Sequence, residues 1–340
     1  MASSANTKDI VAEIPTYIRV FSDGSVERPR QRPFAPPLLH DPLTGISSKD
    51  IVFSHNPTIS ARLYLPKLTD SLHKVPILVY FHGGRFFYES AFSQFYHDHF
   101  KTFVPQAHVI VVSVEYRRHP EHPLPVCYHD SWAALQWVAS HSIKNPTNAE
   151  PWLIQHGDFN RVFIGGDRAG GNIVHNIALR AGTEDLPNHV KIVGAILSHP
   201  YFYSSYPVGS EPITRPEEND LLTVWNFVYP SAPGGIDNPM VNPLAPGAPC
   251  LAGLGCSKII VCVAGKDFFE REGDQYLKKE QHTVSQEAPV NATAGDLKGV
   301  QHSADQLVSP SDKLNNENPT VELAAQKIDT HFLQPEIAPQ

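Results

Sequence analysis

The stretch from Arg161 to Ala178 constrains the fold of this chain more than any other. It is typical of a short buried strand, then a glycine-lined turn, then an apolar helix. Gly166-Asp167-Arg168-Ala169-Gly170 has the frame of a nucleophile elbow, G-x-S-x-G, in which small flanking residues let strand and helix approach closely. An ordinary strand-to-helix turn could carry the same two glycines, so the frame alone leaves both interpretations open.

Arg168 stands where an elbow carries its nucleophile. A guanidinium has no hydroxyl to deprotonate and stays charged at ordinary pH, so it cannot form an acyl-enzyme. The pattern therefore predicts an elbow from which the covalent chemistry is missing.

A second segment favours the elbow over an ordinary turn. The apolar run from Val75 to Phe81 leads directly into His82-Gly83-Gly84-Arg85. This sequence is close to HGGG, a segment whose backbone N–H groups form an oxyanion hole. Two matching segments in the expected order make a chance match improbable.

Further stretches extend the pattern and carry a family resemblance. They are Tyr17–Arg28, Val114–Arg117, Pro120–Pro125, Asp130–Trp137, Pro230–Pro239 and Val261–Asp267. With them, the chain resembles the plant carboxylesterases of the hormone-sensitive-lipase type. That group also contains 2-hydroxyisoflavanone dehydratases, certain alkaloid cyclases and the gibberellin receptors. The resemblance runs from about Ile14 to about Lys278 and fades beyond.

The resemblance implies an α/β-hydrolase fold with a mostly parallel central sheet flanked by helices. The length of 340 residues and the hydrophobic content of 41% suit one large domain, 1–340. Residues 1–50 and about 205–230 are expected to contribute to a small cap over the site. The polar stretch 280–318 is predicted to be irregular, and it offers no apolar strand.

Apolar runs alternate with helical patterns along the chain, as in a doubly wound sheet. Helices are expected at Asp130–His141, at Glu218–Val228 as a cap or ordinary surface helix, and at Pro319–Leu333, packed on the sheet. Strands are expected at Ile51–Ser54, Ala61–Leu65, Val75–Phe81, His108–Tyr116, Val162–Gly165, Ile192–Leu197 and Lys258–Val263.

The resemblance also implies the remaining site residues. Gly84, Arg85 and Ala169 correspond to the residues whose N–H groups form the oxyanion hole. Asp267, after a predicted strand and turn, matches the acid that orients the histidine, although it could instead cap a helix. His302 is the best match for the histidine, and the alternative is a solvent-exposed loop residue. Arg85, in place of the third glycine, adds a long cation where substrate would approach.

Composition excludes several other classes of function. A formal net charge of −8 and a pI near 6.1 give no basic surface for nucleic acid. No leader-like or membrane-spanning apolar run is seen, so a soluble, cytoplasmic protein is expected. Without C-x-x-C spacing, Cys127, Cys250, Cys256 and Cys262 are predicted to be reduced and mostly buried. No cofactor and no metal are predicted.

Three hypotheses for function follow. The first is a carboxylesterase-family protein whose hydrolysis of small esters is impaired by Arg168. The second is a non-hydrolytic dehydratase or cyclase of plant specialised metabolism, acting on a phenolic or alkaloid substrate. The third is a small-molecule binding protein or pseudoenzyme, in which Arg85 and Arg168 hold a carboxylate. The oligomeric state and the natural substrate are not determined by the sequence.

Overall fold

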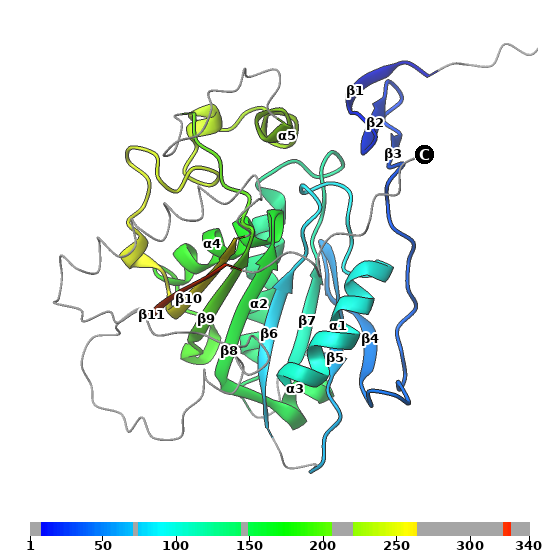
Figure 1. The fold of residues 1–340 in the computed structure, drawn as a ribbon, viewed down its shortest axis with the longest axis vertical. Helices are drawn as coiled ribbons and strands as arrows, with labels where there is room; N and C mark the ends of the chain where they lie inside the picture. Colours follow the sequence, from blue (N-terminus) through cyan, green and yellow to red (C-terminus); the bar gives the residue numbers. More distant parts are fainter. Residues whose placement is uncertain (1–7, 71–73, 144–148, 206–219, 264–321, 328–340) are drawn as a thin grey trace, which may run out of the picture.

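An eight-stranded sheet forms the centre of the molecule (Figure 1). The computed structural model describes residues 8–70, 74–143, 149–205 and 220–263 and the backbone of 322–327. The strands are β1 (Ile10–Ile14), β2 (Ile18–Phe21), β3 (Val26–Glu27), β4 (Ser47–His55), β5 (Thr58–Leu65), β6 (Val75–Phe81), β7 (Ile110–Glu115), β8 (Gly157–Asp167), β9 (Ile192–Ser198), β10 (Cys256–Val263) and β11 (Glu322–Lys327). In the large sheet the order is β11-β10-β9-β8-β6-β7-β5-β4, and β1, β2 and β3 form a separate antiparallel sheet.

The large sheet is parallel from β11 to β7 and antiparallel only where β5 and β4 are added. This arrangement confirms the predicted fold class. All seven predicted strands are present, and the run at Val75–Phe81 has the predicted bounds. β8 begins at Gly157, earlier than predicted, because its first residues are polar and lack the apolar signal.

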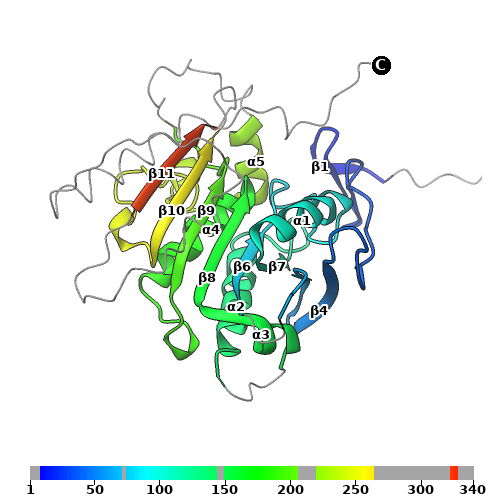
Figure 2. The same cartoon turned by 60° about the horizontal axis from the view of Figure 1, so that its bottom comes forward.

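Helices cover both faces of the sheet (Figures 1 and 2). In Figure 1, α1 lies in front of the sheet, whereas α2 and α4 lie behind it. The helices are α1 (Gln94–Ala107), α2 (Val126–Ser140), α3 (Pro151–His156), α4 (Ala169–Ala181) and α5 (Asp220–Val228), with short 3-10 turns η1 (Pro187–His189), η3 (Gly235–Asp237) and η4 (Leu251–Gly253). The helix predicted at Asp130–His141 is therefore α2, and it begins earlier, at Val126. The predicted helix at Glu218–Val228 is α5, described from Asp220 onward.

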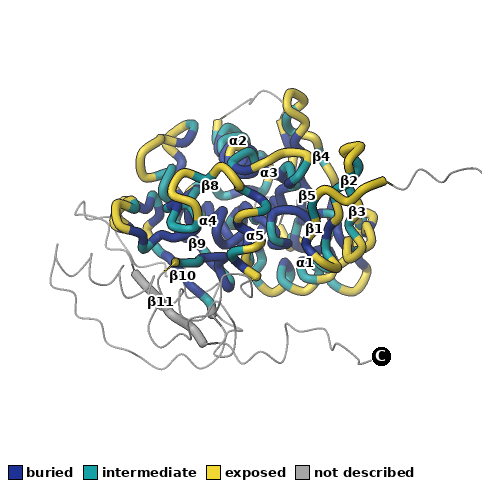
Figure 3. Tube along the Cα trace, turned by 90° about the horizontal axis from the view of Figure 1, so that it is seen from above, coloured by how far each residue is buried: buried dark blue, intermediate teal, exposed yellow. Residues whose placement is uncertain are grey.

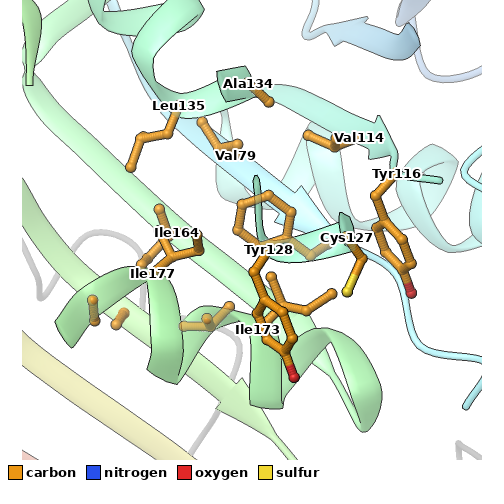
Figure 4. Packing of buried hydrophobic residues seen from close by; sticks show 14 of the residues in the cluster. Val79, Val114, Tyr116, Cys127, Tyr128, Ala134, Leu135, Ile164, Ile173 and Ile177 are labelled. Carbon is orange, nitrogen blue, oxygen red and sulfur yellow. The ribbon is translucent and has the colours of Figure 1, made fainter. Parts of the chain in front are cut away.

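Strand β6 shows why the central runs are apolar at every position. Leu78 belongs to the core cluster that includes residues of α1, whereas Ile77 and Val79 belong to the cluster that includes α2 and α4. Successive side chains of a strand point to opposite faces, and both faces here are covered by helices. Figure 4 shows Val79, together with Ile164 of β8, among the side chains of the second cluster.

The prediction of a C-terminal helix at Pro319–Leu333 is wrong for the residues that the structure describes there. Glu322–Lys327 is strand β11, which pairs in parallel with β10 over its whole length. The segment contains the helix-forming residues Glu, Leu, Ala, Gln and Lys. Pairing with the edge of a sheet overrides such intrinsic preferences, which are worth only tenths of a kcal/mol per residue.

The two segments predicted to contribute to a cap lie near the same end of the large sheet (Figures 1 and 3). The first contains β1, β2 and β3, and the second contains α5. Strands β6, β7 and β8 point toward this end, so the loops that follow them lie beneath the two segments.

All four cysteines are free, as predicted. Cys127 and Cys256 are buried, but Cys250 is exposed, so the thiols are less buried than expected. Among the residues that the structure describes, no helix has the length and apolar character needed to cross a membrane.

Gly182, the C-cap of α4, is predicted to be essential for the packing of this helix. A Cβ added there would lie 1.8 Å from the carbonyl oxygen of Gly253. We expect Gly182→Ala to lower the free energy of unfolding by about 1–3 kcal/mol, because backbone must move to admit the methyl group. Urea denaturation measures this effect. Gly253→Ala is the matched control, because its Cβ would have no atom within 4 Å, and equal losses in the two variants would contradict the prediction.

Candidate active site

Arg168 has the strained backbone that an elbow requires. Its φ is 50° and its ψ is −111°, at the junction between β8 and α4. A positive φ is costly for a side chain other than glycine, and it persists only where the surroundings fix it. The Arg168 N–H donates to the carbonyl of Ser198 (2.8 Å), and its carbonyl accepts from the N–H groups of Asn172 and Tyr201 (3.0 and 2.9 Å). The elbow geometry is therefore present, with an exposed arginine at its tip.

The two glycines of the elbow frame are required by close backbone contacts. A Cβ on Gly170 would lie 1.9 Å from the carbonyl oxygen of Phe81, at the end of β6. A Cβ on Gly166 would lie 2.5 Å from the carbonyl of Gly170. Real Cβ atoms do not approach other atoms so closely. The glycines thus bring α4 against the end of β6, which confirms the structural role predicted for the frame.

The loop after β6 lies beside the elbow. Phe81 and Gly166 are register partners in the parallel pair β6–β8, so His82–Arg85 and Asp167–Ala169 leave the sheet at neighbouring points. Gly84 has a φ of +96°, and a Cβ there would lie 2.4 Å from the Glu89 side chain. A glycine is needed at this position for both reasons.

Asp167 joins the two segments. Its Oδ1 accepts hydrogen bonds from the Gly83 N–H (3.0 Å) and from the hydroxyls of Tyr80 (3.0 Å) and Tyr96 (2.9 Å). Burial, with the neighbouring Asp167 charge, raises the pKa of both tyrosines well above its usual value, so both remain donors. Donors that converge on one carboxylate therefore hold the elbow against His82–Arg85. This segment is called the oxyanion loop, after the role predicted for it.

His82 is a structural residue of the same loop. Its fully buried ring is stacked on Tyr116, with 4.2 Å between the ring centroids. Nδ1 lies 2.8 Å from the Gly83 carbonyl oxygen, so it acts as the donor. Burial lowers the pKa of His82 to about 3, so the ring is neutral at ordinary pH. It supports the loop rather than serving as a general base.

Backbone donors remain available at the positions predicted for an oxyanion hole. Within the described part of the chain, no hydrogen bond uses the N–H of Gly84, Arg85 or Ala169. Ala169 is the first residue of α4, where backbone N–H groups lack partners within the helix. Such groups beside a helix N-terminus favour negative charge on an oxygen atom.

The acid and the histidine predicted for the site, Asp267 and His302, lie outside the described residues. Sequence reasoning missed the contribution of Asp167, Tyr80 and Tyr96, because no spacing rule connects them. One sequence signal for Asp167 was its place between the two glycines of the elbow, where a side chain can reach the neighbouring strand.

These features define an α/β hydrolase. A family profile described as alpha/beta hydrolase fold matches residues 78–305. Among solved structures, the chain is similar to Vibralactone Cyclase (TM-score 0.56, 19% identity, 70% of this chain and 68% of that chain). It is also similar to a hyperthermophilic esterase from Pyrobaculum calidifontis (TM-score 0.51, 26% identity, 69% of this chain and 70% of that chain).

Sequence relatives narrow the family. The chain is 57% identical over 283 residues to 2-hydroxyisoflavanone dehydratase of Glycyrrhiza echinata. The match covers 82% of this chain and 86% of the relative. It is 40% identical over 275 residues to Probable carboxylesterase 1 of Arabidopsis thaliana, with 79% and 83% covered. The chain therefore belongs to the plant carboxylesterase group of the hormone-sensitive-lipase type, as its motifs predicted.

The Asp167 carboxylate is predicted to be a main support of the site. Asp167→Asn keeps the acceptor oxygen Oδ1 but removes the negative charge, and hydrogen bonds to a charged group contribute about 1.5–3 kcal/mol each against about 0.5–1.5 kcal/mol for neutral ones. We expect a loss of about 2–4 kcal/mol in the free energy of unfolding by urea denaturation. Asp185→Asn is the control, because it removes the charge of an exposed carboxylate that pairs with the Lys191 side chain at 3.1 Å. A loss no larger than that of the control would contradict this role.

The free energy of unfolding is predicted to decrease as the pH is lowered, because the folded chain holds His82 neutral. The pKa of His82 is about 3 in the folded chain but about 6.5 in an unfolded one, so below pH 6.5 the unfolded state binds the extra proton. The stabilisation is fully present above pH 6.5 and is lost toward pH 3, by up to about 1.4 kcal/mol per pH unit. When the free energy of unfolding is measured at pH 7, 6, 5 and 4, it should change less steeply with pH for His82→Gln than for the parent chain. The exposed His40→Gln should keep the parent slope, and parallel curves for all three proteins would refute the assignment.

Proposed function

We propose that the chain binds a small organic carbonyl compound and stabilises negative charge on its oxygen, while its hydrolysis of esters is impaired. One observation carries the proposal: the elbow backbone and its neighbouring N–H donors are present, and Arg168 stands at the tip. A carboxylesterase of this fold uses a hydroxyl at that tip to attack the ester carbon. Arg168 cannot do so.

The remaining donors still have catalytic value. Enzymes of this kind that lose the nucleophile retain on the order of 10³-fold acceleration over water, from the oxyanion hole and from binding. Ester hydrolysis by this chain is accordingly expected to be slow. Its substrates are small esters, taken by analogy with the carboxylesterases of the family.

A second candidate function is the removal of water from a hydroxyl-bearing ketone. It is favoured by the 57% identity to a relative named 2-hydroxyisoflavanone dehydratase. In such an elimination, a base removes a proton from the carbon beside the carbonyl, and the carbonyl oxygen gains negative charge. The bond from the next carbon to its hydroxyl then breaks, a carbon–carbon double bond forms, and the departing hydroxide takes back the proton held by the base to become water. No step needs a covalent nucleophile.

The N–H groups of Gly84, Arg85 and Ala169 suit the charge that develops on the carbonyl oxygen. By resemblance to the family, His302 would act as the base and Asp267 would orient it. A phenolic or alkaloid substrate fits this proposal. Small-molecule binding without catalysis is the function expected if neither reaction is found.

Arg168→Ser is predicted to restore part of the esterase activity. The substitution supplies a hydroxyl, and it removes a cation from the N-terminus of α4, where the helix dipole disfavours positive charge by about 0.3–1 kcal/mol. We expect slightly higher stability and a measurable gain in p-nitrophenyl acetate hydrolysis, and Arg85→Gly should add to the gain by widening access. His302→Ala, added to the double variant, should abolish it.

The same variants separate the two reactions. If dehydration is the native activity, the parent chain should convert 2-hydroxyisoflavanone, Arg168→Ser should retain this conversion, and His302→Ala should lose it. A folded double variant without any gain in ester hydrolysis would contradict the assignment of His302. A His302→Ala variant that dehydrates as well as the parent would rule out elimination with His302 as the base.

A further inference from the structure

The Arg85 side chain connects the oxyanion loop to two segments that are distant in the sequence. Its Nη2 lies 2.5 Å from Oδ2 of Asp220, the first residue of α5. Its guanidinium carbon lies 4.5 Å from the centre of the Tyr17 ring, in the turn between β1 and β2. One side chain thus contacts both segments predicted to contribute to the cap.

Other contacts secure each segment separately. Phe227, near the C-terminal end of α5, packs against Phe87, with ring centroids 5.7 Å apart. Tyr17 packs against Tyr88, with centroids 5.2 Å apart. Each of these contacts joins the loop after β6 to a single segment, whereas Arg85 joins the loop to both.

The closed position of the Arg85 side chain also carries a cost. Among the residues that the structure describes, none accepts a hydrogen bond from its buried Nη1, whereas its backbone φ of 55° is the same whether the side chain is closed or open. A buried donor without a partner costs free energy because it has lost its water. This cost offsets part of the attraction to Asp220 and Tyr17.

The exposure of the ion pair also indicates a weak contact. The side chains of Arg85 and Asp220 are 24% and 58% exposed. Pairs exposed to this degree contribute at most about 1 kcal/mol, and dissolved salt screens them. Opening the pair lets Asp220 turn to water without leaving a buried carboxylate.

We propose that Arg85, Tyr17 and Asp220 form a clasp that controls access to the oxyanion loop, which makes Arg85 a specificity-determining residue. The Arg85 N–H is one of the expected oxyanion donors, and its side chain ties together the two segments above that donor. A ring-sized neutral molecule reaches the loop only when the Arg85–Asp220 pair opens. Smaller molecules are less affected. The clasp acts on access alone and requires neither of the reactions proposed above.

Hydrogen–deuterium exchange of the full chain tests the clasp itself. Asp220→Asn should make the amides of α5 exchange about two- to fivefold faster, and Arg85→Gly, which suits a positive φ, should accelerate both α5 and β2. Sodium chloride at 1 M should reproduce the effect in the parent and leave Asp220→Asn unchanged. Glu184→Gln is the matched control, because it breaks the comparably exposed ion pair with Arg180 in α4.

The association rate of Nile red, a neutral ring-sized dye, tests access. Stopped-flow fluorescence should show about two- to fivefold faster association with Asp220→Asn and Arg85→Gly than with the parent or Glu184→Gln. Because the dye carries no charge, the lost carboxylate does not steer it. Unchanged exchange in α5 for both variants would overturn the clasp. If Nile red associates with these two variants no faster than with the parent, the proposal that the clasp controls access is overturned.

Discussion

The hydrogen bonds to the Asp167 carboxylate hold together the two halves of the site. The elbow joins the end of β8 to the start of α4, and the oxyanion loop follows β6, so hydrogen bonds between the two segments help to fix their relative position. Three donors from Tyr80, Tyr96 and Gly83 meet on one oxygen of Asp167, which lies inside the elbow itself. The charge on that oxygen strengthens each bond and is itself satisfied by them. Together with the hydrogen bond from the Tyr116 hydroxyl to the His82 carbonyl (2.7 Å), these bonds set the position of the oxyanion loop beside the elbow.

The positive φ of Arg168 and the close contacts of the elbow glycines both arise because α4 begins directly beside the end of β6. Placing Arg168 at the tip with φ at 50° requires α4 to begin immediately against β6, and the space left beside Phe81 accepts no Cβ at Gly170. The scaffold imposes this geometry through backbone bonds and contacts that do not involve the side chain at the tip. The elbow therefore has its shape with an arginine at the tip, a residue that cannot act as a covalent nucleophile. Architecture and reaction are separable in this fold.

Much of the fold was predictable because buried parallel strands carry an unbroken apolar signal, as Val75–Phe81 does. The tight turns after β6 and β8 were predictable because glycines mark close backbone contacts. The helix predicted at Pro319–Leu333 failed where a sheet edge, invisible in local sequence, overrode helix preference at β11. The convergence of Tyr80 and Tyr96 on Asp167 could not be predicted, since it depends on strand order. The Arg85–Asp220 contact was missed for the same reason, because the two residues meet only through tertiary structure.

The strand order also bears on how the chain folds during synthesis. Strands β4 to β10 follow one another along the chain, and β11 is added last, at the edge beside β10. Domains form from the N-terminal side as the ribosome delivers them. Both the oxyanion loop and the elbow lie between strands made well before β11, so a nascent chain can form these two segments while β11 is still being translated.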